Sequence, residues 1–291
     1  MKQLKPTQTN ETRGFILALV SVLCFATTSL LLGHLSNAYG VDGWVASAYR
    51  AAVGLIVIVV MQNKTGQLQI THILKNRLLF ARGLIGGATI PVYYICIMEL
   101  GPGRAGIING SYPLFASVCA FFLLKEHLRQ SYFVYITFAL IGLVLVFADD
   151  CIGNSNPFYN ALAVIGAAAG GLCVVMIRHL RHSETTSTIF AAQCVFTLII
   201  AIIVARDRLI VCNLQALGFT LIASITVVSG QLTLTESFRH INVAKGSTLQ
   251  MLTPALTILM SALLINEHFS AIEIIGGIII FFFSYRIAIS R

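Results

Sequence analysis

Charged residues are scarce in this 291-residue sequence. Asp, Glu, Lys and Arg make up only 10% of it, whereas 57% of the residues are hydrophobic. Soluble domains carry about 25% charged residues. A water-soluble chain could not cover its surface with so little charge, so the sequence predicts an all-α integral membrane protein in contact with the lipid bilayer. The net charge of +8 does not indicate a nucleic-acid partner, because the basic residues do not form one cluster.

The sequence also lacks the residue patterns of metal centres and of most enzymes. Its seven histidines are scattered near the ends of apolar stretches, and no HxxxH, CxxC or GxSxG pattern occurs. A membrane enzyme needs such groups clustered together. We therefore expect no catalytic residue, no metal and no cofactor. Cys151 and Cys212 fall in loops on one predicted face, and their spacing alone leaves a disulfide between them undecided.

One stretch of the chain occurs twice. Residues 104–127 read RAGIINGSYPLFASVCAFFLLKEH, and residues 245–268 read KGSTLQMLTPALTILMSALLINEH. A shift of 141 residues aligns five pairs: Arg104 with Lys245, Asn109 with Gln250, Pro113 with Pro254, Glu126 with Glu267, and His127 with His268. Five matches in register favour a duplicated unit over two apolar helices that agree by chance.

Ten apolar stretches are long enough to cross about 30 Å of hydrocarbon, which takes roughly 20 residues. They cover residues 14–33, 41–61, 78–98, 105–124, 132–148, 158–176, 187–205, 214–234, 246–265 and 272–289. The polar segment 149–157 (DDCIGNSNP) divides them into two halves. We expect a first repeat in residues 1–148, a linker in 149–157 and a second repeat in 158–291.

The positive-inside rule tests this number of spans. With a cytoplasmic N-terminus, the cytoplasmic segments hold fourteen bases: Lys2, Lys5, Arg13, Lys64, Lys75, Arg77, Lys125, Arg129, Arg178, Arg181, Arg239, Lys245, Arg286 and Arg291. The opposite side holds three, Arg104, Arg206 and Arg208. This asymmetry favours ten transmembrane helices with both termini in the cytoplasm. Five spans are an odd number, so the two five-helix repeats are inverted.

These features together resemble a known family. Two halves of five spans, with Pro113 and Glu126 in the fourth span and Pro254 and Glu267 in the ninth, resemble the EamA branch of the drug/metabolite transporter superfamily. The resemblance covers nearly the whole chain. It implies a central cavity lined largely by spans one, three, four, six, eight and nine, alternating access without ATP, and a bacterial cytoplasmic (inner) membrane. It does not indicate the substrate, because the superfamily moves many kinds of metabolites and drugs.

The two central prolines are the first candidates for a substrate site. Pro113 and Pro254 lie near the middle of their predicted spans. A helical proline lacks the N–H group and frees a carbonyl one turn earlier, which must find another partner. We expect each proline to kink its helix and line the cavity. The alternative is a packing kink without a ligand role.

Polar residues flank both prolines at matched positions. The nearest candidates for substrate contact are the residues four and one before each proline, Asn109, Tyr112, Gln250 and Thr253. Amides at this depth bind a polar ligand or hydrogen-bond a neighbouring helix. Further candidates, each five residues before a matched glutamate in spans three and eight, are Tyr94 and Gln231.

Arg50 is the only formal charge near the middle of any predicted span. A buried arginine costs several kcal/mol unless it is paired, and no Asp or Glu lies at a comparable depth. Arg50 either attracts an anionic or zwitterionic substrate or binds carbonyls and Tyr hydroxyls as a structural anchor. We favour the anchor, because span two is peripheral to the cavity in the family that the chain resembles. Arg82 lies nearer the cytoplasmic edge and is expected to snorkel towards it.

Four glutamates lie near the ends of spans. Glu126 and Glu267 close the fourth and ninth spans at the membrane interface, where we expect a structural or gating role. Glu99 and Glu236 lie on opposite faces at the ends of spans three and eight. They are the better candidates for a gate or for proton coupling, which requires a buried carboxylate with a raised pKa.

The pattern favours a secondary active transporter of a small polar or amphipathic metabolite that works by alternating access. An integral-membrane enzyme, a channel and a non-transporting membrane sensor are the alternatives. The sequence leaves open the substrate, the direction of transport, a coupling proton or counter-substrate, and whether the protein is a monomer or a homodimer. The glycine-rich runs 83–88 and 166–171 predict close helix contacts.

Overall fold

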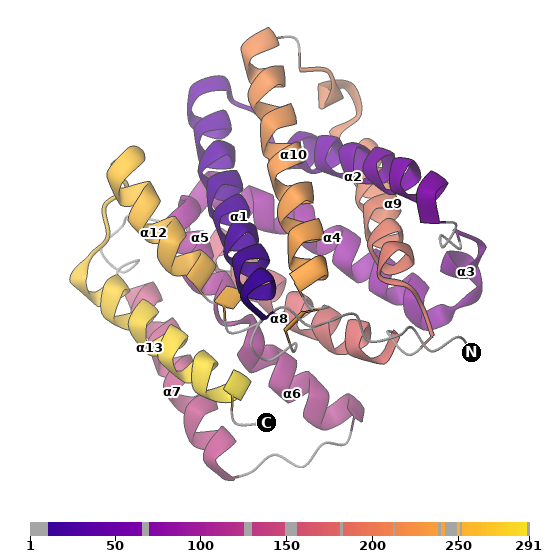
Figure 1. Ribbon diagram of the computed structural model, residues 1–291. Coiled ribbons are helices and arrows are strands. Elements are labelled where there is room, and N and C mark those ends of the chain that lie inside the picture. Colours follow the sequence, from indigo (N-terminus) through magenta and orange to yellow (C-terminus); the bar gives the residue numbers. More distant parts are fainter. Residues whose placement is uncertain are drawn as a thin grey trace.

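The computed structural model describes residues 11–65, 70–124, 130–148, 156–180, 183–211, 213–237, 240–241, 249–250 and 252–289. All regular secondary structure in these residues is helical (Figure 1). The helices are α1 (Glu11–Tyr39), α2 (Gly43–Thr65), α3 (Ile70–Lys75), α4 (Arg77–Leu100), α5 (Pro102–Asn109), α6 (Tyr112–Leu124), α7 (Gln130–Ala148), α8 (Pro157–Leu180), α9 (Thr186–Ala205), η2 (Arg206–Leu209), α10 (Leu214–Ser237), α12 (Leu252–Leu264) and α13 (Ala271–Ile289).

The surface of the helix bundle is that of a membrane protein. Large apolar side chains such as Ile56, Val60, Ile203 and Ile225 are more than half exposed, which suits lipid rather than water. Six helices in the described residues are long and apolar enough to cross a membrane, namely α1, α2, α4, α8, α9 and α10. The all-helical membrane class is thus confirmed, whereas the number of ten spans stays a prediction.

Helices from distant parts of the chain lie side by side. In Figure 1, α1 packs along α10, α7 along α13, and α9 along both α2 and α4. Glycines make the closest of these contacts possible. A Cβ added at Gly87 of α4 would lie 2.8 Å from the backbone nitrogen of Thr197 in α9, and one at Gly142 of α7 would lie 2.8 Å from the carbonyl oxygen of Gly276 in α13. The predicted close contacts of the run 83–88 are therefore present.

The predicted fourth span is broken rather than kinked. Helix α5 ends at Asn109 and α6 begins at Tyr112, with a turn between them. Both the backbone N–H and the hydroxyl of Ser111 donate to the carbonyl of Ile108, at 3.1 and 2.6 Å. Pro113 is the second residue of α6, where a missing N–H costs little. The expectation of one continuous helix over 105–124, kinked at Pro113, was wrong.

The bundle has two ends that the contacts define. At the first, which we name the α5 end, the start of α5 meets α1, with Pro102 3.2 Å from a Cβ placed at Gly33. The Tyr39 hydroxyl also meets Gln215 at the start of α10 there. At the second, which we name the α3 end, lie α3 and the connection from α8 to α9. The predicted topology places the α5 end outside and the α3 end in the cytoplasm.

Candidate functional site

The two copies of the repeated stretch meet where α5 crosses α12. A Cβ placed at Gly106 of α5 would lie 3.7 Å from the Cα of Pro254, which is the third residue of α12. Asn109 is half-buried at the last residue of α5, and the buried Pro113 follows the break. Pro113 therefore lies at the start of a short helix. The structure brings the two repeated stretches together, as expected for residues that share one site.

The second amide of the matched pair already has a protein partner. Gln250 Nε2 donates to Ser21 Oγ at 2.7 Å, on α1. This is the helix-to-helix contact that we weighed as the alternative to a ligand role. Thr253 carries a buried hydroxyl without a hydrogen-bond partner in the described part of the chain. Tyr112 is half-buried at the first residue of α6. Substrate contact by these residues stays a prediction.

Glu267 caps the start of α5 from the opposite half of the chain. Its carboxylate oxygens accept hydrogen bonds from the backbone N–H groups of Gly103, at 3.0 Å, and Arg104, at 3.2 Å. The first N–H groups of a helix lack internal partners and carry partial positive charge, so a carboxylate stabilises them. Gly101, with φ of +90°, allows the backbone before α5 to approach the Glu267 carboxylate closely. A Cβ at this position would lie 2.5 Å from Glu267 Oε1.

Burial changes the acidity of this carboxyl group. Desolvation raises the pKa of Glu267 above its ordinary value, although hydrogen bonds from Gly103, Ser261 and Arg104 act in the opposite direction. Burial thus makes Glu267 easier to protonate than a fully solvated carboxyl group. Glu267 thus combines an interhelical contact with a proton-binding group.

Arg104, which the charge distribution assigned to the side opposite the cytoplasm, is buried. Its Nη1 lies 3.1 Å from Glu273 Oε1 of α13, and both side chains are buried. Its Nη2 also donates to the carbonyl of Val146 in α7 at 3.1 Å. The side chain thereby connects α5 to α7 and α13, and the assignment of Arg104 to the side opposite the cytoplasm stays a prediction.

The remaining glutamates occupy separate places. Glu99 is exposed in the last turn of α4, and Glu236 of α10 is half-buried, 4.0 Å from His240. Glu126 lies outside the described residues, as do Cys151 and Cys212. Gln231 is half-buried on α10. No contact between Glu99 and Glu236 occurs in the described residues, and their gating role stays a prediction.

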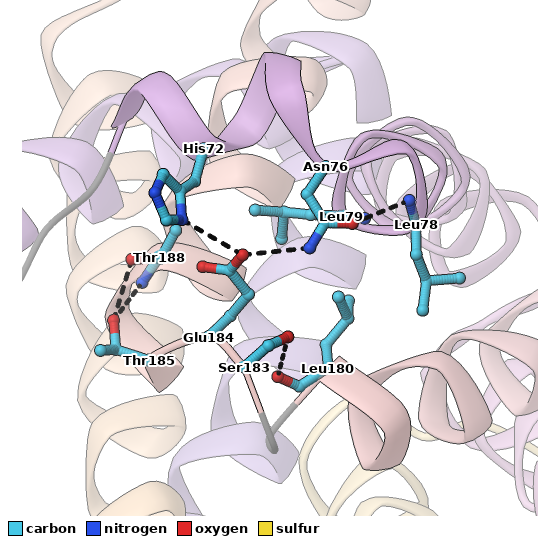
Figure 2. Close-up of polar contacts among 9 residues, drawn as sticks. All are labelled: His72, Asn76, Leu78, Leu79, Leu180, Ser183, Glu184, Thr185 and Thr188. Atoms are coloured by element: carbon cyan, nitrogen blue, oxygen red, sulfur yellow. Dashed lines mark hydrogen bonds and ion pairs between the residues drawn. The ribbon is translucent and has the colours of Figure 1, made fainter. Parts of the chain in front are cut away.

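A polar cluster at the α3 end was not predicted. Figure 2 shows Glu184 between His72 and Asn76: its Oε1 lies 3.4 Å from His72 Nδ1 and accepts a hydrogen bond from Asn76 Nδ2 at 3.0 Å. Asn76 also caps α4, and Thr185 caps α9. One feature of the sequence could have indicated this cluster: Glu184 is the only acidic residue between Asp150 and Asp207.

A second unpredicted cluster lies inside the bundle, between α2, α4 and α9. Arg50 and Arg82 are buried, at 4% and 5% exposure, on helices α2 and α4, which pack against each other. Arg82 Nη2 donates to Gln193 Oε1 at 3.4 Å. Its guanidinium extends past Gly86, one turn further along α4, where a Cβ would overlap it. Arg82 therefore points away from the α3 end, which the predicted topology places in the cytoplasm, and the expectation of snorkelling was wrong.

Comparison with known proteins agrees with this architecture. The model of the EamA-like transporter family matches residues 12–148 and 157–288, which together are most of the chain. The chain belongs to the EamA-like transporter family. The resemblance read from Pro113, Glu126, Pro254 and Glu267 is thereby confirmed. Membership of the EamA-like family indicates a membrane transporter rather than an enzyme.

Two curated proteins and one solved structure of another protein are also similar to this EamA-like chain. Solute carrier family 35 member G1 of Mus musculus is 25% identical over 58% of this chain and 48% of its own. The Homo sapiens protein of the same name is 24% identical over 54% and 44%. The chain thus spans about half the length of these relatives. A crystal structure, at 16% identity and a TM-score of 0.63 over 95% of this chain and 97% of that one, shares the fold.

Proposed function

We propose that the protein is a secondary active transporter that moves a small polar or amphipathic metabolite across a bacterial cytoplasmic membrane by alternating access. Two inverted five-helix repeats, residues 1–148 and 158–291, form its two halves. In such carriers the two repeats rock against each other around a site near the middle of the bilayer. One chain holds both repeats, so a monomer suffices for this mechanism.

The observation that carries the proposal is a symmetry in the helix packing. In the described residues the nine most extensive helix pairings all join the first half to the second. Exchanging each helix for its counterpart leaves this set unchanged: α1–α10 becomes α8–α4, α1–α12 becomes α8–α6, and α2–α10 becomes α9–α4. The pairings α2–α9 and α7–α13 map onto themselves, and so does α5–α12 when α5 and α6 are taken together as the counterpart of α12. A two-fold axis between the halves is expected to produce this pattern.

Matched hydrogen bonds support the same symmetry. Asn76 caps α4 through Leu78 and Leu79, and Asn213 caps α10 in the same way, 137 residues later. The offset equals that between Glu99 and Glu236. Chance does not readily explain two N-caps at equivalent places. Each cap satisfies N–H groups at the start of a helix, and the fold requires both helices.

Contacts between the halves at both ends are candidate gates. At the α5 end Glu267 caps α5, and Asp42 Oδ2 lies 2.8 Å from Arg208 Nη1. At the α3 end Glu184 joins His72 and Asn76. Alternating access requires that one set opens while the other holds. Glu126, the counterpart of Glu267 in the first half, is proposed for the opposite gate.

The substrate site of this proposal lies at the crossing of α5 and α12. Split helices direct the ends of short helices, with their free backbone groups, towards a bound solute. Asn109, Tyr112, Gln250 and Thr253 belong to the two repeated stretches that meet at this crossing. Tyr94 lies on α4, which packs against α5, and Gln231 on α10 and Arg50 on α2 are further candidates. The raised pKa of Glu267 supports coupling to a proton, and exchange with a counter-substrate is the competing mode.

Uptake into liposomes that contain the purified protein tests the proposal. Pools of labelled metabolites are screened with and without an imposed pH gradient, and the active pool is repeated with Asn109→Ala and Gln250→Ala. Gln215→Ala is the matched control, because it removes an exposed amide at the start of α10. We expect saturable uptake that both site variants lose and the control keeps.

Two results would count against the proposal in different ways. Saturable uptake that is unchanged in both site variants keeps the transporter and moves the site away from the α5–α12 crossing. No uptake of any pool by protein that unfolds cooperatively contradicts the transporter function and favours a sensor.

A further inference from the structure

Arg50 and Arg82 are two buried like charges that have no counter-charge among the residues that the structure describes. Each is at most 5% exposed. In the described part of the chain, the Nε and Nη1 atoms of both residues lack a hydrogen-bond partner, and neither residue forms an ion pair. The nearest acids along α2 and α4 are engaged or exposed, since Asp42 pairs with Arg208 and Glu99 lies at the surface.

Such an arrangement is costly for a protein without a ligand. A buried ion that lacks a partner forfeits its hydration, and two like charges repel each other more strongly where the dielectric is low. Arginine cannot escape by losing its proton, because its guanidinium stays charged in proteins. An arrangement of this kind persists in a folded protein when a ligand of opposite charge occupies it.

The surrounding groups suit an anion with several acceptor oxygens. Guanidinium groups bind carboxylate and phosphate through two parallel hydrogen bonds. Tyr94 adds a hydroxyl that is buried, without a partner in the described residues, and within electrostatic reach of Arg50. Gln193 orients Arg82 from α9 and anchors itself to the Gly86 carbonyl at 3.3 Å. The Nε and Nη1 atoms of the two arginines and the Tyr94 hydroxyl are thus five buried donors without a partner in the described residues.

We propose that Arg50, Arg82 and Tyr94 bind the carboxylate or phosphate group of a small organic anion, and that this anion is the transported solute. The second part of this inference, that the bound anion is transported, rests on the proposed transport function. The first part, that the three residues bind an anion, does not. The same oxyanion chemistry is present in a phospholipid headgroup, so the test separates a free solute from a lipid.

The position of the cluster supports a role in transport. Arg50 and Gln193 occupy matched places in the two halves, 143 residues apart. They lie on α2 and α9, a pairing that maps onto itself when the halves are exchanged. The proposed ligand groups belong to the first half, and Gln193 of the second half orients one of them, Arg82. The ligand should therefore bind most tightly in the arrangement of the halves that keeps this contact. That differential affinity is what a carrier needs to couple binding to its conformational change.

The first test is thermal unfolding of delipidated protein in detergent. Succinate and inorganic phosphate are the probes, and glycerol is the neutral control. We expect at least one anion to raise Tm saturably, by at least about 2 °C, and glycerol to leave it unchanged. Arg50→Met and Arg82→Met should abolish the shift, and Arg50→Lys should weaken binding at least about tenfold.

The variants without ligand provide a second, independent measurement. Arg50→Met and Arg82→Met each remove one of two repelling charges, so their Tm without anion should equal or exceed that of the natural protein. The matched control is Arg208→Gln, which removes a charge that is 63% exposed and should keep the anion-induced shift. A structural anchor gives the opposite result: both Met variants lose stability, and no anion raises the Tm of the natural protein.

Lipid and transport arms identify the source of the anion. A shift produced by phosphatidylglycerol nanodiscs, but by neither succinate nor phosphate, keeps the oxyanion site and contradicts a solute as its ligand. Anion binding without uptake into liposomes keeps the site and contradicts the transport function. Saturable uptake of uncharged metabolites by a protein that no anion stabilises keeps the transporter and overturns the site.

Discussion

Arg104 and Glu273 form an ion pair that is buried on both sides: the Nη1 and Oε1 atoms lie 3.1 Å apart, and neither side chain is more than 8% exposed. Arg104 belongs to α5 in the first half and Glu273 to α13 in the second. The pair therefore ties the start of the broken fourth span to the last helix of the chain. Its charges cancel inside the protein, which distinguishes it from the unpaired Arg50 and Arg82.

Breaking this pair on one side should be strongly destabilising. Glu273→Gln leaves the Arg104 guanidinium buried without its counter-charge, which typically costs about 3–5 kcal/mol. Arg104→Met with Glu273→Met removes both charges and should restore most of the lost stability. Thermal unfolding of the two single variants and the double variant, as a double-mutant cycle, measures the coupling. Additive losses in the double variant would contradict a direct pair.

Glu267 should make stability depend on pH in a defined direction. Because burial raises its pKa above 4.5, the folded protein binds this proton more tightly than the unfolded chain does. Protonation of Glu267 therefore contributes fully to the stability of the folded protein below the pKa of the unfolded chain. This contribution is lost as pH rises through the pKa of the folded state. Glu267→Gln removes the titration, so the Tm of the natural protein minus that of the variant should fall as pH is raised from about 4.5.

Ser261→Ala serves as the control for this titration. It keeps the carboxyl group but removes a hydrogen bond that lowers the pKa of Glu267. The loss of stability should therefore move to a higher pH than in the natural protein. A difference between natural protein and Glu267→Gln that grows with pH would show that the capping charge outweighs burial, contrary to the expectation.

Sequence predicts a structural feature well when the feature depends on many residues, and poorly when it depends on one partner that is distant in the chain. Low charge and long apolar stretches predict the all-helical membrane class, because both reflect the solvent that the whole chain faces. The repeat with Pro113 and Glu126, and with Pro254 and Glu267, suffices for the family. These properties depend on many residues, so no single contact can reverse them.

The features that the sequence analysis mispredicted or missed are those that a single tertiary contact determines. The break before Pro113 depends on Ser111, which binds the Ile108 carbonyl twice. The burial of Arg104 depends on Glu273, which is distant in sequence. The direction of Arg82 depends on Gly86, whose missing side chain leaves room for the guanidinium. No periodicity or composition predicts such partners, because tertiary packing selects them.

The two equivalent N-caps should differ in their worth. Asn76→Ala and Asn213→Ala each remove a cap, at a typical cost of about 1 kcal/mol. Asn76 also donates to Glu184 at 3.0 Å, so its loss should cost about 1 kcal/mol more. Thermal unfolding of both variants in the natural background and in Glu184→Gln measures this excess. The extra loss of stability in Asn76→Ala should be smaller in the Glu184→Gln background. Equal losses of stability in Asn76→Ala and Asn213→Ala in the natural background would contradict a stabilising contact at the α3 end.

Gly86 should control the position of the Arg82 guanidinium. A methyl group at Gly86 would overlap it, so Gly86→Ala must displace Arg82 from Gln193 and from the proposed oxyanion site. Gly170→Ala is the matched control in α8, because nothing lies within 4 Å of a Cβ there, and alanine should stabilise that helix by about 0.5–1 kcal/mol. We expect Gly86→Ala to lose the rise in Tm caused by succinate or phosphate and Gly170→Ala to keep it. A full anion-induced rise in Gly86→Ala would mean that Arg82 is not one of the groups that bind the anion.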